Sequence, residues 1–369
     1  MNDRGPHKII RVLVVEDSQT VAEWLTHALT LDGGISVVGV ARDGEEALEA
    51  AYRLRPDVIT MDILMPKLNG FEATRRIMET CPTPILIVSA AANLHEIATE
   101  FRVLEAGALA VLARPPGGAD PCHDSSVVEL IKTIKLMSEV KVVRRWPRAA
   151  PAGDRAGVGP NRATPRVAAG PASGSVRAIA IGASTGGPLA LRTVLSGLPI
   201  TLGAPVLIVQ HMTAGFVSGF AEWLAQSSGF PVRVAADGES LLPGRAYLAP
   251  DGFHMGVRAD NRIFLSEDAE IDGLRPAVSF LFHSVRQAFA GDVVAVLLTG
   301  MGQDGVTELK RLKECGAVTI AQDEESSVIH GMPGQAIRIG GATHILPPEV
   351  IAETLATLVT QGPVPRHKS

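Results

Sequence analysis

A serine stands in a glycine-rich turn near the middle of the chain, in the run AIAIGASTGGP at 178–188. The apolar residues before Ser184 predict a buried strand, and Pro188, followed by apolar residues at helical spacing, predicts the start of a helix. Such a turn lifts one side chain to the edge of a sheet and points backbone N–H groups at whatever binds there. Taken alone, the turn fits a phosphate site and a nucleophilic hydroxyl equally well.

A histidine and an aspartate follow two other predicted strands of the same half, which we expect to be a doubly wound, Rossmann-like parallel sheet. Strands are expected at 178–182, 205–209, 293–299 and 317–321. Parallel strands present their carboxyl ends at one edge of a sheet, so His211 and Asp304 are expected beside Ser184. An imidazole that takes the serine proton, an acid that orients it, and the amides of glycine-rich loops supply what acyl transfer needs.

Each member of this group has an alternative role. Ser184 could cap the following helix or hold a phosphate, His211 could be a buried structural histidine, and Asp304 could cap the helix that starts directly after it. Three further histidines could serve as the base: His254, His283 and His330. A dinucleotide site is disfavoured, because the turn lacks the GxGxxG pattern and the second strand ends in Gln210 where an acid would bind a ribose.

Charged and hydroxyl side chains also follow the strands predicted in the first half, which we expect to be an open, flavodoxin-like parallel sheet. Strands are expected at 9–15, 36–40, 57–61, 85–88 and 108–112. The residues that follow them are Glu16, Asp17, Asp62, Ser89 and Arg114. Crowded carboxylates repel one another, and a hard cation such as Mg²⁺, often with a phosphate, relieves the repulsion. A flavin is disfavoured, because two acids would repel its phosphate, and solvated loop acids remain the alternative.

Residues 9–138 resemble the receiver domain of bacterial response regulators. The motifs that carry the resemblance are VVEDS at 14–18, DVITMDILMP at 57–66 followed by KLNG, and PILIVSA at 84–90. The resemblance implies that Asp62 accepts a phosphoryl group and binds Mg²⁺ together with Glu16 and Asp17. It also implies that the hydroxyl of Ser89 senses the phosphoryl group.

Position 114 departs from the pattern of that family. Receivers usually carry a lysine before the final proline of this region, and this chain has Arg114. The planar fork of a guanidinium places its charge differently from an ammonium. We therefore expect the change to bear on the propagation of the signal more than on phosphoryl acceptance.

The second half resembles the catalytic domain of the chemotaxis protein-glutamate methylesterases, the CheB family. Its motifs are IGASTGGP at 181–188, QHM at 210–212, YLAP at 247–250, LTGMGQDG at 298–305 and AQDEESSVIHGMP at 321–333. The resemblance implies that Ser184 is the nucleophile, His211 the general base and Asp304 the acid that orients it. It also implies supporting roles for Thr185 and for the backbone amide of Met301 at the oxyanion.

The implied order is a receiver at 8–138, a flexible linker rich in proline, glycine and arginine at 139–175, and a methylesterase domain at 176–363. A last receiver helix is expected from 123 to about 143. The linker arginines could instead dock on an acidic partner.

The function that the resemblance implies is hydrolysis of glutamate methyl esters on methyl-accepting chemoreceptors, with release of methanol and with deamidation of receptor glutamines. A histidine kinase is the expected phosphodonor. Phosphorylation of Asp62, with Mg²⁺ in the receiver, should uncover the Ser184 edge. The esterase step itself is expected to need no cofactor. The alternative is a response regulator whose output domain is a non-catalytic nucleotide-binding or adaptor module.

The composition limits the classes of partner and the cellular compartment that we expect. The formal net charge is −5, which argues against nucleic acid as a partner, because that role depends on dense positive charge. We see neither a signal peptide nor an apolar run long enough to span a bilayer. The cysteines, Cys81, Cys122 and Cys315, are far apart and lack metal-binding spacing, which suits a reducing cytoplasm. We expect a cytoplasmic monomer.

Overall fold

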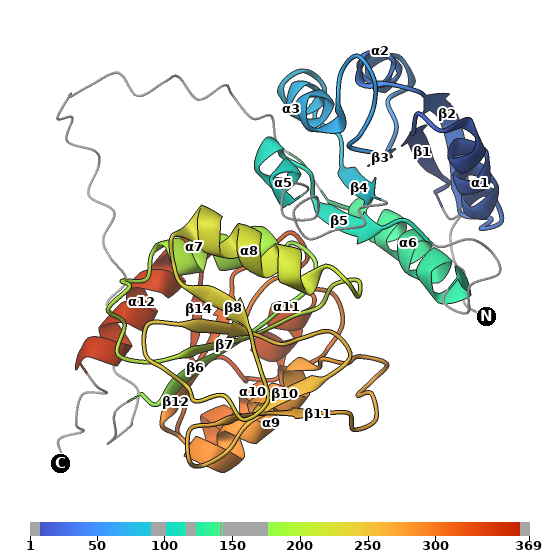
Figure 1. The fold of residues 1–369 in the computed structure, drawn as a ribbon. Coiled ribbons are helices and arrows are strands. Elements are labelled where there is room, and N and C mark those ends of the chain that lie inside the picture. Colours follow the sequence, from blue (N-terminus) through green and yellow to red (C-terminus); the bar gives the residue numbers. More distant parts are fainter. Residues whose placement is uncertain (1–7, 90–100, 116–122, 141, 143–175, 362–369) are drawn as a thin grey trace, which may run out of the picture.

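The structure is a computed structural model that describes residues 8–89, 101–115, 123–140, 142 and 176–361 (Figure 1). Most of the linker expected at 139–175, namely residues 141 and 143–175, and Cys122 therefore lie outside the described residues. Within the described ranges, no helix combines the length and the apolar character needed to cross a membrane.

The first half forms a five-stranded sheet in the order β2-β1-β3-β4-β5, and every pairing is parallel. Its strands are β1 (Ile10–Val15), β2 (Ile35–Ala41), β3 (Val58–Met61), β4 (Ile85–Ser89) and β5 (Ala110–Ala113). Its helices are α1 (Gln19–Thr30), α2 (Gly44–Leu54), α3 (Gly70–Thr80), α5 (Val103–Ala106) and α6 (His123–Met137). This is the flavodoxin-like order, and the predicted fold is confirmed.

The last receiver helix is shorter than predicted. Helix α6 ends at Met137, whereas the sequence predicted a helix to about 143. The N–H groups of Glu139 and Val140 donate to carbonyls three residues back, and the hydroxyl of Ser138 donates to the Lys135 carbonyl. These contacts satisfy the orphan carbonyls and tighten the last turn, so the helix stops.

The second half forms a seven-stranded parallel sheet in the order β14-β13-β12-β6-β7-β9-β8. Its strands are β6 (Ala178–Ala183), β7 (Val206–Gln210), β8 (Val232–Val234), β9 (Ala246–Leu248), β12 (Val293–Leu297), β13 (Val318–Gln322) and β14 (His344–Leu346). Two strands, β10 (His254–Val257) and β11 (Ile263–Ser266), form a separate antiparallel pair. The helices are α7 (Gly187–Ser196), α8 (Val217–Ser228), α9 (Val278–Phe289), α10 (Val306–Glu314), α11 (Met332–Arg338) and α12 (Pro348–Gln361).

The four strands predicted for this half are the four central ones of that order from β13 to β7. The expected strands missed β8, β9 and β14, each of three residues, and the pair β10–β11. Three residues span too little chain to show a periodicity, so β8, β9 and β14 carry no sequence signal. The doubly wound parallel sheet itself is as predicted.

Three neighbouring central strands, β12, β6 and β7, end at the same edge. All residues of β6 are buried, and the chain leaves it directly into the turn that holds Ser184. His211 follows β7, and the loop at 298–305 follows β12. The sheet therefore brings the three loops together, as the strand-end rule predicted.

The two halves touch where α5 lies beside α7 and α8 (Figure 1). The ring of Phe101, just before α5, lies 5.1 Å from the ring of Phe220 and 5.7 Å from that of Trp223, centroid to centroid. Glu105 of α5 forms an ion pair with Arg192 of α7 at 3.0 Å. Among the described residues, the interface thus combines an aromatic cluster with an ion pair.

Candidate active site and phosphorylation site

Backbone hydrogen bonds fix the position of Ser184 and leave its hydroxyl available to react. Its N–H donates to the Thr299 carbonyl at 3.0 Å, and its carbonyl accepts from Gly187 N–H at 2.8 Å. The N-cap of α7 is Gly186, in the left-handed region at φ 79°, and no side chain caps the helix. The alternative of Ser184 as a helix cap is therefore wrong.

A glycine lets the neighbouring loop approach this serine. A Cβ atom on Gly300 would lie 2.6 Å from the Ser184 Cβ and 2.5 Å from the Met332 sulfur. Both distances are far inside van der Waals contact. Only glycine allows the loop after β12 to lie against the turn that holds Ser184 at this point.

His211 and Asp304 lie in direct contact at the same edge. The Nε2 atom of His211 is 2.9 Å from Oδ2 of Asp304, and the two side chains are 11% and 4% exposed. The N–H of His211 donates to the Ala183 carbonyl, which ties the loop to β6. Among the described residues, no hydrogen bond joins the Ser184 hydroxyl to the imidazole, although both line one cavity of about 370 Å³.

Asp304 does not cap the helix that follows it. The N-cap of α10 is Gly305, without a side-chain hydrogen bond. The Asp304 carboxylate instead accepts from the N–H of Val278 at 2.6 Å and of Ser279 at 2.8 Å, at the start of α9. The alternative role of Asp304 as the cap of α10 is therefore wrong, and Asp304 caps α9 instead. A cap that comes from a distant loop leaves no local pattern in the sequence.

These donors keep Asp304 ionised inside the protein. Burial alone would raise the pKa of this carboxyl, but the hydrogen bond and charge of His211, together with the donors of Ser279, lower its pKa below the ordinary value. A carboxylate that is anionic and fixed can hold one tautomer of the imidazole.

Two polar residues that the sequence did not single out as functional tie the site together. The Nε2 atom of Gln210 donates to the carbonyls of Ser184 at 2.9 Å and His211 at 2.7 Å. The hydroxyl of Thr299 donates to the Thr185 carbonyl at 2.9 Å. The position of Gln210 at a strand end beside His211 was visible in the sequence, but its bonding was not.

The three competing histidines serve elsewhere. His254 is buried, accepts from Ala277 N–H at 3.2 Å and stacks on Phe280 at 4.6 Å. His283 faces Glu308 at 3.8 Å, and His330 pairs through its backbone with Gly300. His211 is the histidine that lines the cavity with Ser184.

The cavity has walls from both halves of the chain. Thr185, Met301 and Gln303 line it on the side of Ser184, and Leu109 and Lys132 line it from the first half. Any substrate that reaches Ser184 by this route passes between the two halves.

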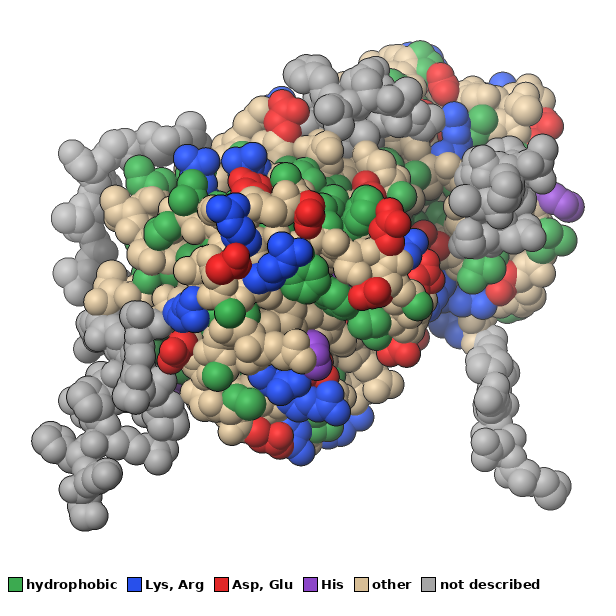
Figure 2. Space-filling model, turned by 60° about the horizontal axis from the view of Figure 1, so that its bottom comes forward, with side chains coloured by type: hydrophobic (Ala, Val, Ile, Leu, Met, Phe, Trp, Pro, Cys, Tyr) green, Lys and Arg blue, Asp and Glu red, His purple; other side chains and the backbone are tan. Residues whose placement is uncertain are grey.

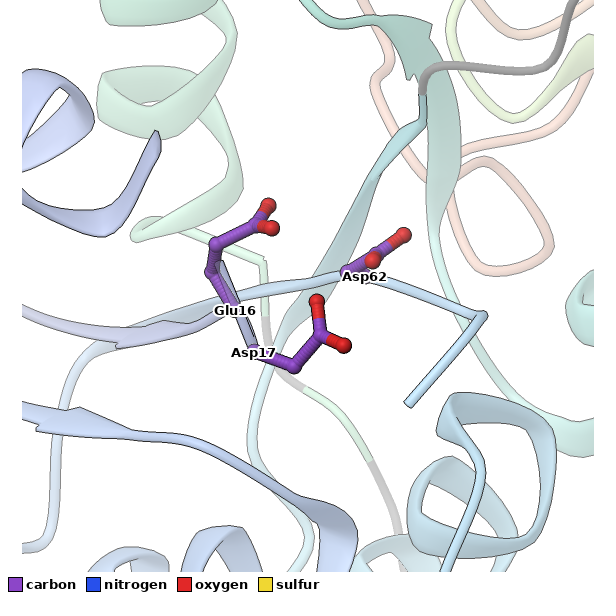
Figure 3. A group of neighbouring side chains, drawn as sticks. All are labelled: Glu16, Asp17 and Asp62. Carbon is purple, nitrogen blue, oxygen red and sulfur yellow. The ribbon is translucent and has the colours of Figure 1, made fainter. Parts of the chain in front are cut away.

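Figure 3 shows Glu16, Asp17 and Asp62 as neighbouring side chains after β1 and β3. Ligand oxygens of the three carboxylates lie within 4.8 Å of one another. Burial and the charge of Asp62 raise the pKa of Glu16 to about 7, and burial also raises the pKa of Asp62. All-oxygen donors in such crowding fit a Mg²⁺ site.

The remaining residues predicted for this site lie at the ends of the neighbouring strands. Ser89 is buried at the end of β4, and its carbonyl accepts from Arg114 N–H at 2.6 Å. A guanidinium nitrogen of Arg114 lies 3.8 Å from a carboxylate oxygen of Glu16. The positive charge of Arg114 therefore partly offsets the negative charge of the carboxylates.

Gly70 brings α3 against this site. A Cβ atom at this position would lie 2.1 Å from the carbonyl oxygen of Asp62. Asn69 caps α3 by accepting from Glu72 N–H, and a carboxylate oxygen of Asp62 accepts from Ile63 N–H at 2.7 Å. The start of α3 thus fixes the loop that carries Asp62.

Comparisons with known proteins match both regions. A family model described as CheB methylesterase matches residues 179–355, and one described as a response regulator receiver domain matches residues 12–120. A protein-glutamate methylesterase/protein-glutamine glutaminase of Geobacter metallireducens is 52% identical over 354 residues, which cover 96% of this chain and 100% of the relative. The chain belongs to the CheB methylesterase family.

A second curated relative agrees with this assignment. A protein of the same name from Syntrophus aciditrophicus is 52% identical over 95% of this chain and 98% of its own. The solved catalytic domain of the CheB methylesterase of Thermotoga maritima is 39% identical, covers 51% of this chain and 100% of its own, and has a TM-score of 0.49. The predicted activity, a protein-glutamate methylesterase and protein-glutamine glutaminase with a receiver domain, is confirmed by the full-length relatives.

Proposed function

We propose that Ser184, His211 and Asp304 are the catalytic triad that hydrolyses glutamate methyl esters on methyl-accepting chemoreceptors. The observation that carries the proposal is the 2.9 Å contact of His211 with Asp304, on the cavity that Ser184 also lines. A fixed acid, an imidazole and a serine on one wall are the parts that acyl transfer requires.

The reaction uses these groups in turn. Asp304 engages Nε2 of His211, so Nδ1 is the ring nitrogen left to take the proton of the Ser184 hydroxyl. The serine oxygen attacks the γ-carbonyl carbon of the ester, and the Met301 N–H, with support from Thr185, stabilises the oxyanion. The carbon–oxygen bond to methoxide breaks, the proton on His211 leaves with it as methanol, and water hydrolyses the acyl-enzyme by the reverse proton path. A glutamine amide follows the same path and releases ammonia.

Methanol release from a methylated chemoreceptor tests this proposal, with Ser184→Ala as the variant and Ser196→Ala, an exposed serine of α7, as the matched control. Wild type and the control should release methanol and react covalently with a fluorophosphonate, and Ser184→Ala should do neither. Methanol release by Ser184→Ala at the wild-type rate would show that another residue is the nucleophile. An adaptor protein would ignore the phosphonate.

We propose that the first half is phosphorylated on Asp62. Glu16, Asp17 and Asp62 would hold Mg²⁺, which supplies positive charge that offsets the carboxylates and the incoming phosphoryl oxygens. The Asp62 carboxylate attacks the phosphorus of a phosphohistidine on the kinase, the phosphorus–nitrogen bond breaks, and an aspartyl phosphate forms. The Ser89 hydroxyl and Arg114 lie at the adjoining strand ends, where they would meet its oxygens.

We propose that the unphosphorylated receiver restricts access to Ser184. The interface around Phe101 and the shared cavity support this, since receiver residues line the same space as the triad. A phosphodonor with Mg²⁺ should raise methanol release by the full chain and leave Asp62→Asn unchanged. A truncated chain that begins at Ser173 should be more active than the unphosphorylated full chain. Equal rates in all of these would overturn the regulation but not the triad.

We further propose domains at 8–138 and 176–363 joined by a linker at 139–175, in a cytoplasmic monomer that acts in chemotaxis or a related signalling pathway. Figure 2 shows acidic and basic side chains interspersed over the visible face, and the net charge is −5. Neither favours nucleic acid as a partner. Sedimentation of the full chain should give one species of about monomer mass.

A further inference from the structure

Helix α9 begins without a cap of its own. Its N-cap residue is Ala277, which has no side-chain acceptor. The first N–H groups of a helix need acceptors from outside the helix, and here Asp304 provides them from the loop after β12. The triad acid therefore stands where the cap of α9 would be.

The two oxygens of this carboxylate have different partners. Oδ2 contacts both His211 Nε2 at 2.9 Å and Val278 N–H at 2.6 Å, whereas Oδ1 accepts from Ser279 N–H at 2.8 Å. A contact on each oxygen prevents rotation of the carboxylate about its Cβ–Cγ bond. The bond to Oδ1 therefore determines that Oδ2 faces the imidazole.

Ser279 also holds the backbone next to Asp304. Its hydroxyl oxygen accepts from Gly305 N–H at 2.8 Å, and Gly305 sits at φ 80°, as the N-cap of α10. Asp304 thus holds the start of α9, and Ser279 of α9 holds the residue after Asp304. The pair forms a reciprocal clasp between the beginnings of two helices.

We propose that Ser279 is a positioning residue for the triad, which through its hydroxyl fixes the Asp304 loop so that the carboxylate keeps His211 oriented toward Ser184. The proposal rests on the catalytic roles proposed above. Without the hydroxyl, Gly305 N–H loses its acceptor, and the left-handed turn at Gly305 is free to shift Asp304. A displacement of a fraction of an ångström at a catalytic group costs rate more than binding.

The test compares Ser279→Ala with Ser284→Ala in the full chain, with a small phosphodonor and Mg²⁺ present. Ser284 lies on the same helix and its buried hydroxyl also bonds backbone, but it holds Val257 of β10 and not the triad loop. We expect Ser279→Ala to lower kcat for methanol release about tenfold, with KM unchanged, and to slow fluorophosphonate labelling of Ser184 equally. Ser279→Thr should restore both to within about twofold, because it keeps the hydroxyl.

The control should distinguish a loss of rate caused by a displaced Asp304 from one caused by lower stability. Ser284→Ala should lower the unfolding temperature and change kcat by less than about twofold. Should Ser279→Ala fail to fold, Ser279→Cys, which keeps the size and weakens the acceptor, makes the same comparison. In an Asp304→Asn background, the Ser279→Ala change should alter kcat by less than about twofold, because the group it positions is gone.

Different failures lead to different conclusions. If wild type neither releases methanol nor reacts with the phosphonate, the proposed triad fails. If wild type is active and Ser279→Ala matches it, or loses no more kcat than Ser284→Ala, the positioning role is wrong. An equal loss from Ser279→Ala with and without Asp304 would also overturn it.

Discussion

At the carboxyl edge of the receiver sheet, Glu16, Asp17 and Asp62 face one another, whereas at the esterase edge Asp304 faces a histidine and two backbone N–H groups. Burial raises the pKa of Glu16 and Asp62 at the first edge. At the second edge, hydrogen-bond donors overcome burial and lower the pKa of Asp304.

The difference shows that a carboxylate at a strand end stays ionised without a cation only where hydrogen-bond donors offset its charge. Both edges belong to parallel sheets with acids in the loops after the strands. The receiver acids lack enough donors to offset their charge, so the edge is suited to a cation and a phosphoryl group. The fold itself supplies Asp304 with donors, so this carboxylate stays ionised in contact with His211.

The largest effect should follow from removing the charge at the esterase edge. Asp304→Asn should lower kcat by roughly 10³–10⁴-fold, because an amide no longer fixes the imidazole tautomer. It should also lower the free energy of unfolding by about 1–3 kcal/mol, because α9 loses part of its cap. Methanol release and denaturant unfolding measure the two effects. Asp237→Asn, an exposed acid that accepts from Leu265 N–H, is the control and should leave kcat unchanged.

The acid at the receiver edge should show the opposite dependence on pH. The pKa of Glu16 is about 7 in the fold against 4.5 ordinarily, so the folded state holds a proton that the unfolded state releases. The free energy of unfolding of the metal-free receiver should therefore fall as pH rises from 4.5 to about 7. Asp304 has a lowered pKa, so its contribution should be lost only as pH falls below 3.8.

Glu16→Gln should remove the contribution of Glu16 to this fall between pH 5 and pH 8. In chelator at pH 8, the variant should be more stable than wild type by up to about 3 kcal/mol. Calorimetry of the full chain at the two pH values measures this. An equal loss of stability in wild type and Glu16→Gln would mean that the receiver acids are not in conflict, and the contrast between the edges would disappear.

A smaller effect is expected where the two edges meet. Phe101→Ala removes the ring that packs on Phe220 and Trp223, so the receiver should release the esterase more often. Methanol release by the unphosphorylated full chain should rise about fivefold to tenfold. Phe71→Ala, a partly exposed phenylalanine of α3, should leave this rate unchanged. If the rate of methanol release does not rise in Phe101→Ala, the aromatic contact does not contribute to regulation.

The smallest effect should come from the ion pair at the same interface. Glu105 and Arg192 are 38% and 31% exposed, and an exposed pair contributes about 0.2–1 kcal/mol. Arg192→Glu should therefore raise the unphosphorylated rate less than about fivefold, and adding Glu105→Arg should reverse the rise. An effect that persists in high salt would argue against simple charge pairing.

The sequence determined which residues reach each edge. Ser184, His211 and Asp304 follow mostly buried strands of four to six residues, as do Glu16 and Asp62, and local patterns predict the order of strands and turns. The sequence also determined the family, since its motifs cover both halves. Strands of three residues, such as β8 and β14, were beyond its reach because they have no measurable period.

Only the tertiary structure decided what each acid meets at its edge. That Asp304 caps α9 and not α10 depends on Val278 lying close to Asp304 in space, although the two residues are 26 positions apart in the chain. The bond of Gln210 to Ser184, that of Ser279 to Gly305 and the packing of Phe101 on α8 depend on pairs at least as distant in the chain. Hydrogen bonds and pKa shifts arise from distances between atoms, and a chain pattern fixes these only within an element. The residues were therefore readable from the sequence, but the environment that gives each its charge state was not.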